Sequence, residues 1–340
     1  MILVTIIIPV YNAQRYLEDC IKSLMKQTIQ SCEFIFVNDG SKDESQSIIE
    51  KYQKNDSRIV LVNQENQGVS VARNNGISKA KGTYLGFVDA GDYVSNDYFE
   101  KLFQIARQTN CDILVTNFST VSKDTIFSNV PIFEVGKNFT SKEIQQQLIP
   151  YFIKEDNLNP VWNKFYKTDV IKNNGIHFPK GIIIGEDGLF NLQAFNVAKS
   201  IFFTDFSGYF YREIENSAVR DVQNKDYFKI ALQQYHYDYQ NQFGVQLETN
   251  EIEKLKSIRF INNIMSLTNI YLNSNFNSSQ KMKYIKAMMK DKIVQKSIKK
   301  YWVEIMFNKT KYQQFILYCI KVKSFFLLQL ATKYSNFRNK

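Results

Sequence analysis

The stretch Thr83-Tyr84-Leu85-Gly86-Phe87-Val88-Asp89-Ala90-Gly91-Asp92 is the most informative part of this chain. Its apolar, β-rich first part predicts a strand, and the carboxylates of Asp89 and Asp92 follow where that strand ends. In an open α/β sheet, ligands bind at the carboxyl ends of the strands. Proteins usually hold Mg²⁺ with one or two carboxylates together with substrate phosphates. The stretch therefore predicts a metal and phosphate site, although two solvated turn acids after a strand give the same local pattern.

Three further apolar runs precede that strand. Residues 4–10, 33–37 and 59–62 are mostly apolar segments of the kind that parallel sheets bury on both faces. Helical spacing of apolar residues follows the first run over residues 16–27. The alternation of strands and helices predicts an α/β fold with a doubly wound, mostly parallel sheet. The polar loops after the strands should then gather at one edge of this sheet.

Motifs in these loops occur in a fixed order. They are Pro9-Val10-Tyr11-Asn12, Val37-Asn38-Asp39-Gly40-Ser41, Asn66-Gln67-Gly68 through Ala72-Arg73-Asn74, and Asp89-Ala90-Gly91-Asp92. The series resembles the signature of family 2 glycosyltransferases over residues 3–100, which implies a GT-A fold. Later segments resemble the bacterial capsular and exopolysaccharide branch of that family: Asn159-Pro160-Val161-Trp162-Asn163-Lys164, Gly185-Glu186-Asp187-Gly188-Leu189-Phe190, and Tyr211-Arg212 with Asn216-Ser217. The resemblance covers about residues 1–220, which we expect to form the catalytic domain.

On the donor side, the resemblance implies that a UDP-sugar binds at the first four motifs. The residues concerned are Pro9, Tyr11, Asn12, Asp39, Gly40, Gly68, Arg73, Asp89 and Ala90. A carboxylate such as that of Asp39 can accept a proton from a base imide or a ribose hydroxyl. The planar, permanently charged guanidinium of Arg73 suits either a diphosphate or a structural carboxylate. Gly40 and Gly68 permit positive φ or close backbone approach, and they are also ordinary turn residues.

The acidic motif departs from the common family form, Asp-x-Asp-Asp. Gly91 occupies the position of the acid that usually holds the metal. The resemblance implies Mn²⁺ or Mg²⁺ as cofactor, with Asp89 and Asp92 as the remaining metal ligands. We therefore expect a metal affinity lower than that of relatives with the full set of acids.

Asp187 is the predicted catalytic base. Inverting sugar transfer needs one group that takes the proton from the attacking acceptor hydroxyl, and a carboxylate within hydrogen-bond reach can do so. The apolar residues 181–184 should bring Glu186 and Asp187 to the mouth of the cleft. Without the family resemblance, two acids at a helix N-terminus, stabilised by the helix dipole, would explain the same pair. The resemblance also implies acceptor-binding residues, namely Trp162, Lys164, Glu186 and Arg212.

The positive charge of the chain is concentrated after residue 220. Residues 221–340 carry 20 Lys or Arg against 8 Asp or Glu, whereas residues 1–220 carry 23 against 25. Helical periodicity covers residues 251–272 and 281–302, and eight lysines lie between Lys281 and Lys300. A basic amphipathic helix favours an anionic membrane surface, although a solvated helix face has the same composition. Nucleic acid is the rival partner for such charge, but no nucleic-acid motif accompanies it.

The segment of residues 315–331 is apolar but is not predicted to span a membrane. It is shorter than the roughly 20 residues that a span needs, and it contains Lys321 and Lys323. Each central lysine would cost about 2.5–3.5 kcal/mol on insertion scales. We expect an interfacial or packed helix instead. Residues 221–340 are thus predicted to form a basic, mainly helical region for membrane association or for assembly into a homo-oligomer.

These observations predict a hexosyl- or N-acetylhexosaminyltransferase. It would move a sugar from a UDP-sugar to a hydroxyl of a lipid-linked oligosaccharide in capsule or exopolysaccharide biosynthesis. The alternative is a catalytically weakened partner subunit of another glycosyltransferase, because Gly91 replaces an acid. A nicotinamide-dependent enzyme is disfavoured, since Pro9-Val10-Tyr11-Asn12 and not a G-x-G-x-x-G motif follows the first strand. Met1 leads directly into that strand and no Cys-x-x-Cys pair is present, so we expect a cytoplasmic protein, peripheral at the inner face of the cell membrane.

Overall fold

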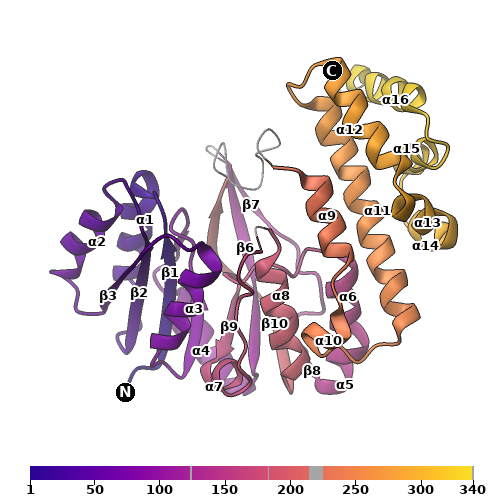
Figure 1. The fold of residues 1–340 in the computed structure, drawn as a ribbon. Helices are drawn as coiled ribbons and strands as arrows, with labels where there is room; N and C mark the ends of the chain where they lie inside the picture. Colours follow the sequence, from indigo (N-terminus) through magenta and orange to yellow (C-terminus); the bar gives the residue numbers. More distant parts are fainter. Residues whose placement is uncertain (123–124, 183, 214–224, 339–340) are drawn as a thin grey trace. The chain divides into compact units, whose positions relative to one another are not determined.

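The computed structural model describes residues 1–122, 125–182, 184–213 and 225–338, and of residues 332–338 it describes the backbone alone. The predicted motif residues Asn216 and Ser217 lie outside the described residues. The chain divides into two compact units. The first comprises Met1–Phe152 and Asp156–Ser217, and the second comprises Ile153–Glu155 and Ala218–Lys340. Figure 1 shows a sheet with flanking helices in the first unit and helices alone in the second.

The first half of unit 1 alternates strands with helices. The elements are β1 (Val4–Val10), α1 (Gln14–Met25), β2 (Cys32–Asp39), α2 (Ser45–Gln53), β3 (Ile59–Gln64), α3 (Val69–Lys79) and β4 (Tyr84–Phe87). The four strands are parallel and lie in the order β3-β2-β1-β4. Every residue of β2 is buried, as expected for a strand covered on both faces. The predicted α/β fold is therefore confirmed, with each loop after a strand at the same edge of the sheet.

The second half of unit 1 extends the sheet with strands of both directions. Its elements are β5 (Tyr93–Val94), α4 (Tyr98–Thr109), β6 (Ile113–Ser122), β7 (Thr125–Ser128), β8 (Asn138–Thr140), α5 (Ser141–Glu143), the π-helical turn Ile144–Leu148, α6 (Ile149–Lys154), β9 (Lys164–Lys167), α7 (Thr168–Asn173), α8 (Glu186–Val197) and β10 (Ser200–Arg212). The full strand order is β3-β2-β1-β4-β9-β6-β10-β5. Because β9 lies antiparallel between β4 and β6, the chain before β9 is brought next to the end of β4.

The segment of residues 181–184 leads into the helix that carries Glu186 and Asp187. No strand forms among the described residues of this apolar segment. Instead Gly185 adopts a left-handed conformation with φ of 94°, and α8 begins at Glu186. Such a φ is readily adopted only by glycine, so Gly185 reverses the chain and places Glu186 and Asp187 in the first turn of a helix. The two acids are thus presented by a helix N-terminus, where their charge is stabilised by the dipole.

Unit 2 consists of helices around their own apolar core. They are α9 (Tyr227–Tyr235), α10 (Tyr239–Phe243), α11 (Thr249–Asn273), α12 (Ser278–Lys290), α13 (Lys292–Lys300), α14 (Trp302–Met306), α15 (Lys311–Lys321) and α16 (Phe325–Arg338). The long helix α11 contributes the buried Phe260, Ile261 and Ile264 to this core. Among the described residues, none of the helices has both the length and the apolar composition required to cross a membrane.

Two predicted helices of unit 2 are interrupted. The helix expected over residues 281–302 stops at Lys290, because Asp291 starts a new helix by accepting hydrogen bonds from the backbone N–H groups of Ile293 and Val294. The helix expected over residues 315–331 breaks after Lys321, where Lys323 is left-handed with φ of 57°. There the N–H of Ser324 donates to the carbonyl of Cys319, a hydrogen bond typical of a helix C-terminus. Apolar residues keep a helical spacing across both breaks, so this spacing did not predict where the helices end.

Candidate active site

Two of the predicted donor loops are tied to each other. Asn12, in the loop after β1, is left-handed with φ of 48° and donates its N–H to Ser41 Oγ at 3.1 Å. Its Oδ1 accepts from the N–H of Lys42 at 2.8 Å. Pro9 lies within β1 opposite Val37, and the side chain of Tyr11 is exposed beyond it. The two loops therefore form one rigid edge from which the Tyr11 ring is free to stack on a ligand.

Asp39, at the end of β2, is buried and already accepts three hydrogen bonds. Its Oδ1 accepts from Gln67 N–H and from Gln64 Nε2, both at 2.8 Å, and its Oδ2 accepts from Gly68 N–H at 2.9 Å. An ionised carboxylate has about four acceptor positions, so about one remains for a ligand. Asp39 thus holds the loop before α3, whatever else it binds.

The two loop glycines differ in what they require. Gly40 has φ of +69°, and a Cβ there would lie 2.8 Å from the backbone nitrogen of Asn66. Gly68 has φ of +89° with open space around it. Gly40 is therefore needed both for its conformation and for the close approach of the Asn66 loop, whereas Gly68 is needed for its conformation alone.

The two acids of the stretch after β4 have different surroundings. The side chain of Asp89 is 37% exposed and forms an ion pair with Arg73. Asp92 is buried, and its oxygens accept from the Tyr209 hydroxyl at 2.7 Å and from Arg212 N–H at 2.9 Å. Burial, reinforced by the charge of Asp89, raises the pKa of Asp92 to about 7. Asp92 therefore anchors the end of β10, whereas Asp89 faces outward beside Ala90.

These acids fit a divalent cation only in part. Asp89 is accessible, and no described residue donates a hydrogen bond to its Oδ2. Both oxygens of Asp92 are committed to protein donors, which does not agree with its predicted role as a metal ligand. No group of three or more His, Cys, Asp or Glu side chains is arranged to hold a metal within the described part of the chain. Asp89 fits a cation that takes its other ligands from water and from a substrate diphosphate.

Arg73 brings the predicted base and the donor-side acid together. Its side chain is only 4% exposed. Nη2 donates to Asp89 Oδ1 at 3.0 Å, while Nη1 donates to Asp187 Oδ1 at 2.5 Å and lies 3.4 Å from Glu186 Oε1. Of the two roles that the sequence left open for Arg73, the structure shows the contact with carboxylates.

Asp187 has the surroundings expected of a general base. Its carboxylate also accepts a hydrogen bond from the backbone of Val161, and its side chain keeps 18% of its surface exposed. Burial raises the pKa of Asp187 to about 7, against the opposing effect of the Arg73 charge. A base with a pKa near the working pH combines ionisation with useful proton affinity.

The acceptor-side predictions are only partly compatible with the structure. Trp162 is 7% exposed because its ring stacks on Tyr209 and Tyr211, with centroid distances of 4.5 and 5.6 Å. Lys164 is 1% exposed, and its Nζ donates to Pro160 O and Asn163 Oδ1 at 2.5 and 3.0 Å. The expectation that Lys164 contacts an acceptor is therefore corrected: its ammonium is enclosed and fixes the preceding loop.

Arg212 has its guanidinium packed over two aromatic rings. It lies 4.9 Å from the centroid of Tyr16 and 5.3 Å from that of Tyr93, and Nη2 donates to Asp19 Oδ2 at 3.2 Å. The side chain is 19% exposed. The Arg212 guanidinium, near the end of β10, is thus a partly accessible cation. It lies close enough to Asp92 to lower the pKa of that carboxyl.

Two residues that help to build this site, Asn74 and Phe178, were not predicted from the sequence as site residues. Asn74 donates from Nδ2 to the carbonyl of Phe178 and accepts from the N–H of Phe178, both at 2.8 Å. This pairing holds the Phe178 ring under the guanidinium of Arg73, with the guanidinium carbon 5.2 Å from the ring centroid. Asn74 stands in the quoted Ala72-Arg73-Asn74 motif, which was a signal, whereas nothing local marks Phe178.

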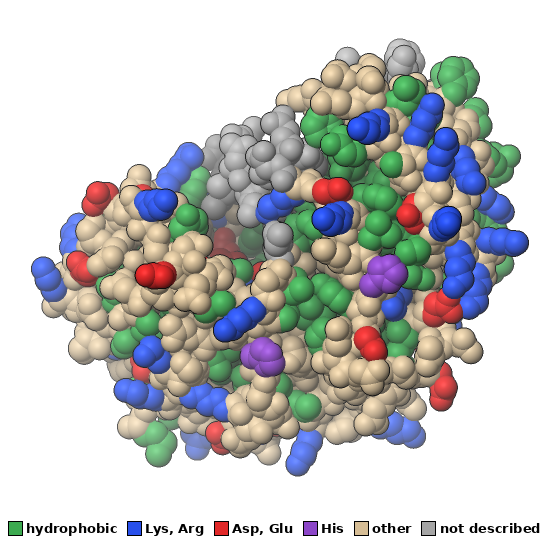
Figure 2. Space-filling view, viewed as in Figure 1, with side chains coloured by type: hydrophobic (Ala, Val, Ile, Leu, Met, Phe, Trp, Pro, Cys, Tyr) green, Lys and Arg blue, Asp and Glu red, His purple; other side chains and the backbone are tan. Residues whose placement is uncertain are grey.

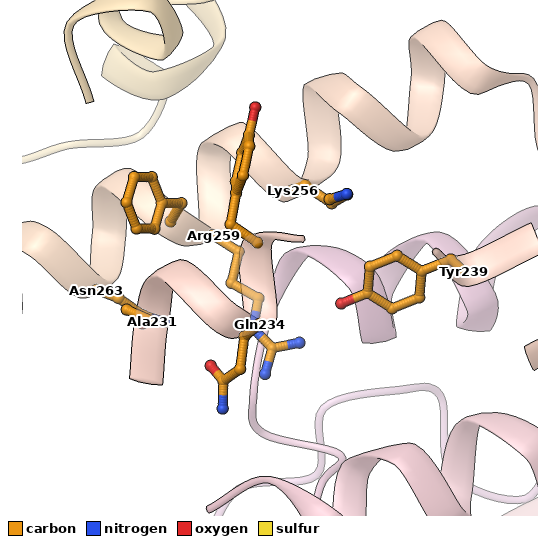
Figure 3. Close-up of a pocket in the computed structure, with 8 residues that line it drawn as sticks. Ala231, Gln234, Tyr239, Lys256, Arg259 and Asn263 are labelled. Atoms are coloured by element: carbon orange, nitrogen blue, oxygen red, sulfur yellow. The ribbon is translucent and has the colours of Figure 1, made fainter. Parts of the chain in front are cut away.

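A separate hollow in unit 2 lacks these features. Figure 3 shows Gln234 and Arg259 extending into it and the hydroxyl of Tyr239 turned toward them. Lys256 lies at its edge with Nζ donating to Tyr237 O at 3.0 Å. Among the residues that the structure describes, no Asp or Glu lines this hollow.

Comparison with known proteins identifies the family. The model of "Glycosyl transferase family 2" matches residues 5–166. The uncharacterized glycosyltransferase EpsJ of Bacillus subtilis is 40% identical over 215 residues, or 63% of this chain and 62% of EpsJ. Glycosyltransferase GlyG of Streptococcus pneumoniae is 30% identical over 226 residues, or 64% of this chain and 73% of GlyG. The chain thus covers less than two thirds of the length of EpsJ.

A solved structure shows the same fold. Residues 1–349 of S. aureus TarS, crystallised in complex with UDP-GlcNAc, superpose with a TM-score of 0.67 at 20% identity, covering 98% of this chain and 92% of that one. The sheet, the helical region after it and the sequence relatives all agree with the family indicated by the motifs. This chain belongs to glycosyl transferase family 2.

Proposed function

We propose that this protein is an inverting glycosyltransferase that moves a sugar from a UDP-sugar to a hydroxyl of a lipid-linked oligosaccharide during capsule or exopolysaccharide synthesis. Family membership supports sugar transfer. The UDP-GlcNAc complex of TarS, a protein of the same fold, supports a UDP-sugar donor. The observation that carries the proposal is the convergence of Asp187, Arg73 and Asp89 beside the loops of Tyr11 and Asp39.

In the proposed reaction, Asp187 takes the proton of the acceptor hydroxyl. The oxygen of that hydroxyl forms a bond to the anomeric carbon of the donor sugar as the bond from that carbon to the diphosphate breaks. Tyr11 would stack on the uracil, and the remaining acceptor position of Asp39 would face the base or ribose. Mn²⁺ or Mg²⁺, when bound at Asp89, would neutralise charge on the leaving diphosphate.

A donor screen tests this function. The full-length protein is incubated with UDP-glucose, UDP-galactose, UDP-GlcNAc and UDP-GalNAc, together with lipid-linked acceptors, and products are identified by mass spectrometry. We expect one UDP-sugar to be consumed with a matching mass gain on the acceptor. Consumption of none of them, with no UDP binding by calorimetry, would overturn the proposal.

The second candidate is a catalytically weakened partner of another glycosyltransferase. Gly91 at the usual position of an acid and the enclosed carboxylate of Asp92 favour it. Such a protein would bind UDP but would not turn over any UDP-sugar by itself. Turnover by the isolated chain at rates within the usual enzyme range, about 1–10³ s⁻¹, would exclude this candidate.

The proposed lipid-linked acceptor requires the enzyme to work at a membrane surface, and unit 2 carries features suited to it. Figure 2 shows Lys and Arg side chains gathered over the helical unit. Seven lysines of α12 and α13 are exposed, though Lys296 and Lys300 pair with Glu253. Large apolar side chains are exposed on the same unit, with Val303 at 77% and Phe307 at 71%. Anionic headgroups and the acyl boundary would complement these two features.

We expect vesicle binding to depend on the exposed lysines of α12. Each Lys near an anionic surface contributes about 1 kcal/mol, so changing Lys283, Lys286 and Lys290 to Glu should weaken binding to anionic vesicles by at least about 10²-fold. Vesicle flotation at low and high salt measures the change. Truncation is unsuitable here, because α12 to α16 contribute buried side chains to the core of unit 2.

A matched control uses three exposed lysines of unit 1. The triple change of Lys54, Lys79 and Lys81 to Glu alters the net charge of the protein by the same amount. It should leave vesicle binding close to that of the wild type. Equal losses in both variants would mean that only net charge matters, and equal binding of the wild type to neutral and anionic vesicles would contradict a role for the lysines.

A further inference from the structure

One guanidinium joins three parts of the site that are distant in sequence. Arg73 comes from α3, Asp89 from the loop after β4, and Asp187 from the first turn of α8. The Arg73 side chain contacts both acids and Glu186 while remaining 4% exposed. Because the contacts use two different nitrogen atoms, the separation of Asp89 from Asp187 is set by the width of a single planar group.

The guanidinium of Arg73 is held in place by an aromatic ring packed against one of its faces. Its carbon lies over the Phe178 ring, and that ring stacks on Phe190 of α8 with centroids 4.1 Å apart. Two hydrogen bonds between the Asn74 side chain and the Phe178 backbone, one donated by each residue, fix the backbone of Phe178. Arg73 therefore has a defined height and orientation, which a loosely held surface arginine would lack.

We propose that Arg73 is a positioning residue for the catalytic base, and not a ligand of the donor diphosphate. It fixes Asp187 relative to Asp89, the acid on the donor side. The inference rests on the proposed function. Arg73 Nη1 and the Val161 backbone each donate one hydrogen bond to the Asp187 carboxylate, and an ionised carboxylate has about four acceptor positions, so it keeps capacity to receive the acceptor's proton. The base is thereby held at a set distance from the donor before the acceptor arrives.

The burial of Arg73 supports positioning over phosphate binding. Nη1 and Nη2 both contact carboxylates, and the aromatic ring covers one face of the group. To reach a diphosphate, the guanidinium would have to give up its ion pair with Asp187 or with Asp89, whose side chains are 18% and 37% exposed, and breaking a poorly exposed pair leaves a charge uncompensated. Arg73 therefore stays with the acids when the donor binds.

The change of Arg73 to Lys tests the proposal, because Lys keeps the charge but cannot span two carboxylates. We expect kcat for transfer to fall by about 10²-fold, the effect of misplacing a reacting group by about 1 Å. The affinity for UDP, measured by calorimetry, should stay within about threefold of the wild type. The KM for the donor should change as little as the UDP affinity.

Arg58→Lys is the matched control. Arg58 is also a poorly exposed arginine paired with an acid, Asp56, and it packs over the Phe34 ring. It lies outside the site, so its replacement should lower thermal stability without changing kcat. Phe178→Leu provides a second test if the Arg73→Lys protein does not fold, since it removes the support under the guanidinium and should also lower kcat without weakening UDP binding.

The pH profile separates positioning from a general loss of stability. With Lys at position 73, the ascending limb of the kcat profile should shift, whereas in Arg58→Lys it should not move. The charged or titratable groups that act on Asp187 are Arg73, Glu186, Asp89, Lys164 and Tyr166. Only the first of them is altered in the test variant.

Three results would overturn the inference. A loss of UDP affinity of about tenfold or more in Arg73→Lys would make Arg73 a donor ligand. Unchanged kcat in both Arg73→Lys and Phe178→Leu would remove the positioning role while leaving the proposed function intact. A wild-type protein that neither binds UDP nor transfers sugar would refute both the proposed function and the inference that rests on it.

Discussion

Replacing Asp187 by Asn should lower the transfer rate by about 10²–10⁴-fold, the usual cost of losing a general base. The amide has nearly the same shape but cannot take the acceptor's proton. Its side chain lies between Arg73 and the backbone of Val161, so the fold around it should persist. UDP affinity should stay nearly unchanged, because Asp187 is not among the residues of the donor loops.

The pH dependence of the wild type gives an independent view of the same residue. Burial raises the pKa of Asp187 to about 7, and the base acts only when ionised. The value of kcat should therefore increase as the pH rises through about 7 and decrease as the pH is lowered below that value. Steady-state rates measured from pH 5 to 9 check this, and near-normal turnover by Asp187→Asn would exclude Asp187 as the base.

The second large effect is expected at Asp89. Its replacement by Ala removes the accessible carboxylate of the site and one partner of Arg73, and should lower kcat/KM by about 10²–10³-fold, as the loss of a preorganised electrostatic group does. After treatment with a chelator, Mn²⁺ or Mg²⁺ should restore the activity of the wild type but should not stimulate the Asp89→Ala protein. Both rates and metal titrations are measured on the full-length protein.

Asp92→Asn is the informative comparison. Asp92 anchors Tyr209 and the backbone of Arg212, so the change should reduce stability by about 1–3 kcal/mol, the cost of disturbing a buried hydrogen-bonded group. Its response to metal should survive, unlike that of Asp89→Ala. A lost metal response in Asp92→Asn with full response in Asp89→Ala would reverse the two roles, and full activity of the wild type in chelator would argue against a metal requirement.

The sequence was sufficient for the parallel half of the sheet. The runs that became β1, β2, β3 and β4 are mostly apolar, and in β1, β2 and β4 this pattern follows from burial on both faces. The breaks in unit 2 were missed because apolar periodicity is continuous across Asp291 and Lys323, while a cap and a left-handed residue decide where each helix ends.

The site was only partly predictable for a different reason. The family motifs pointed to Arg73, Asp89 and Asp187, but they gave no indication that one buried guanidinium contacts both acids, because this contact joins α3, the loop after β4 and α8, which lie far apart in the sequence. Likewise Lys164 matches a motif and yet is enclosed, because its ammonium satisfies the carbonyl of Pro160. Sequence patterns locate polar residues at strand ends but do not show which of their atoms remain accessible.

The stereochemistry of the product tests the central claim most directly. A single base and in-line displacement on an α-linked UDP-sugar must give a β-glycoside, whichever donor the screen identifies. Proton NMR of the transferred sugar distinguishes the two products by the coupling of the anomeric proton when the sugar has the gluco or galacto configuration. We expect a β-linked product from the wild type, and its formation by Asp187→Asn should be slower by about 10²–10⁴-fold. An α-linked product would contradict this expectation.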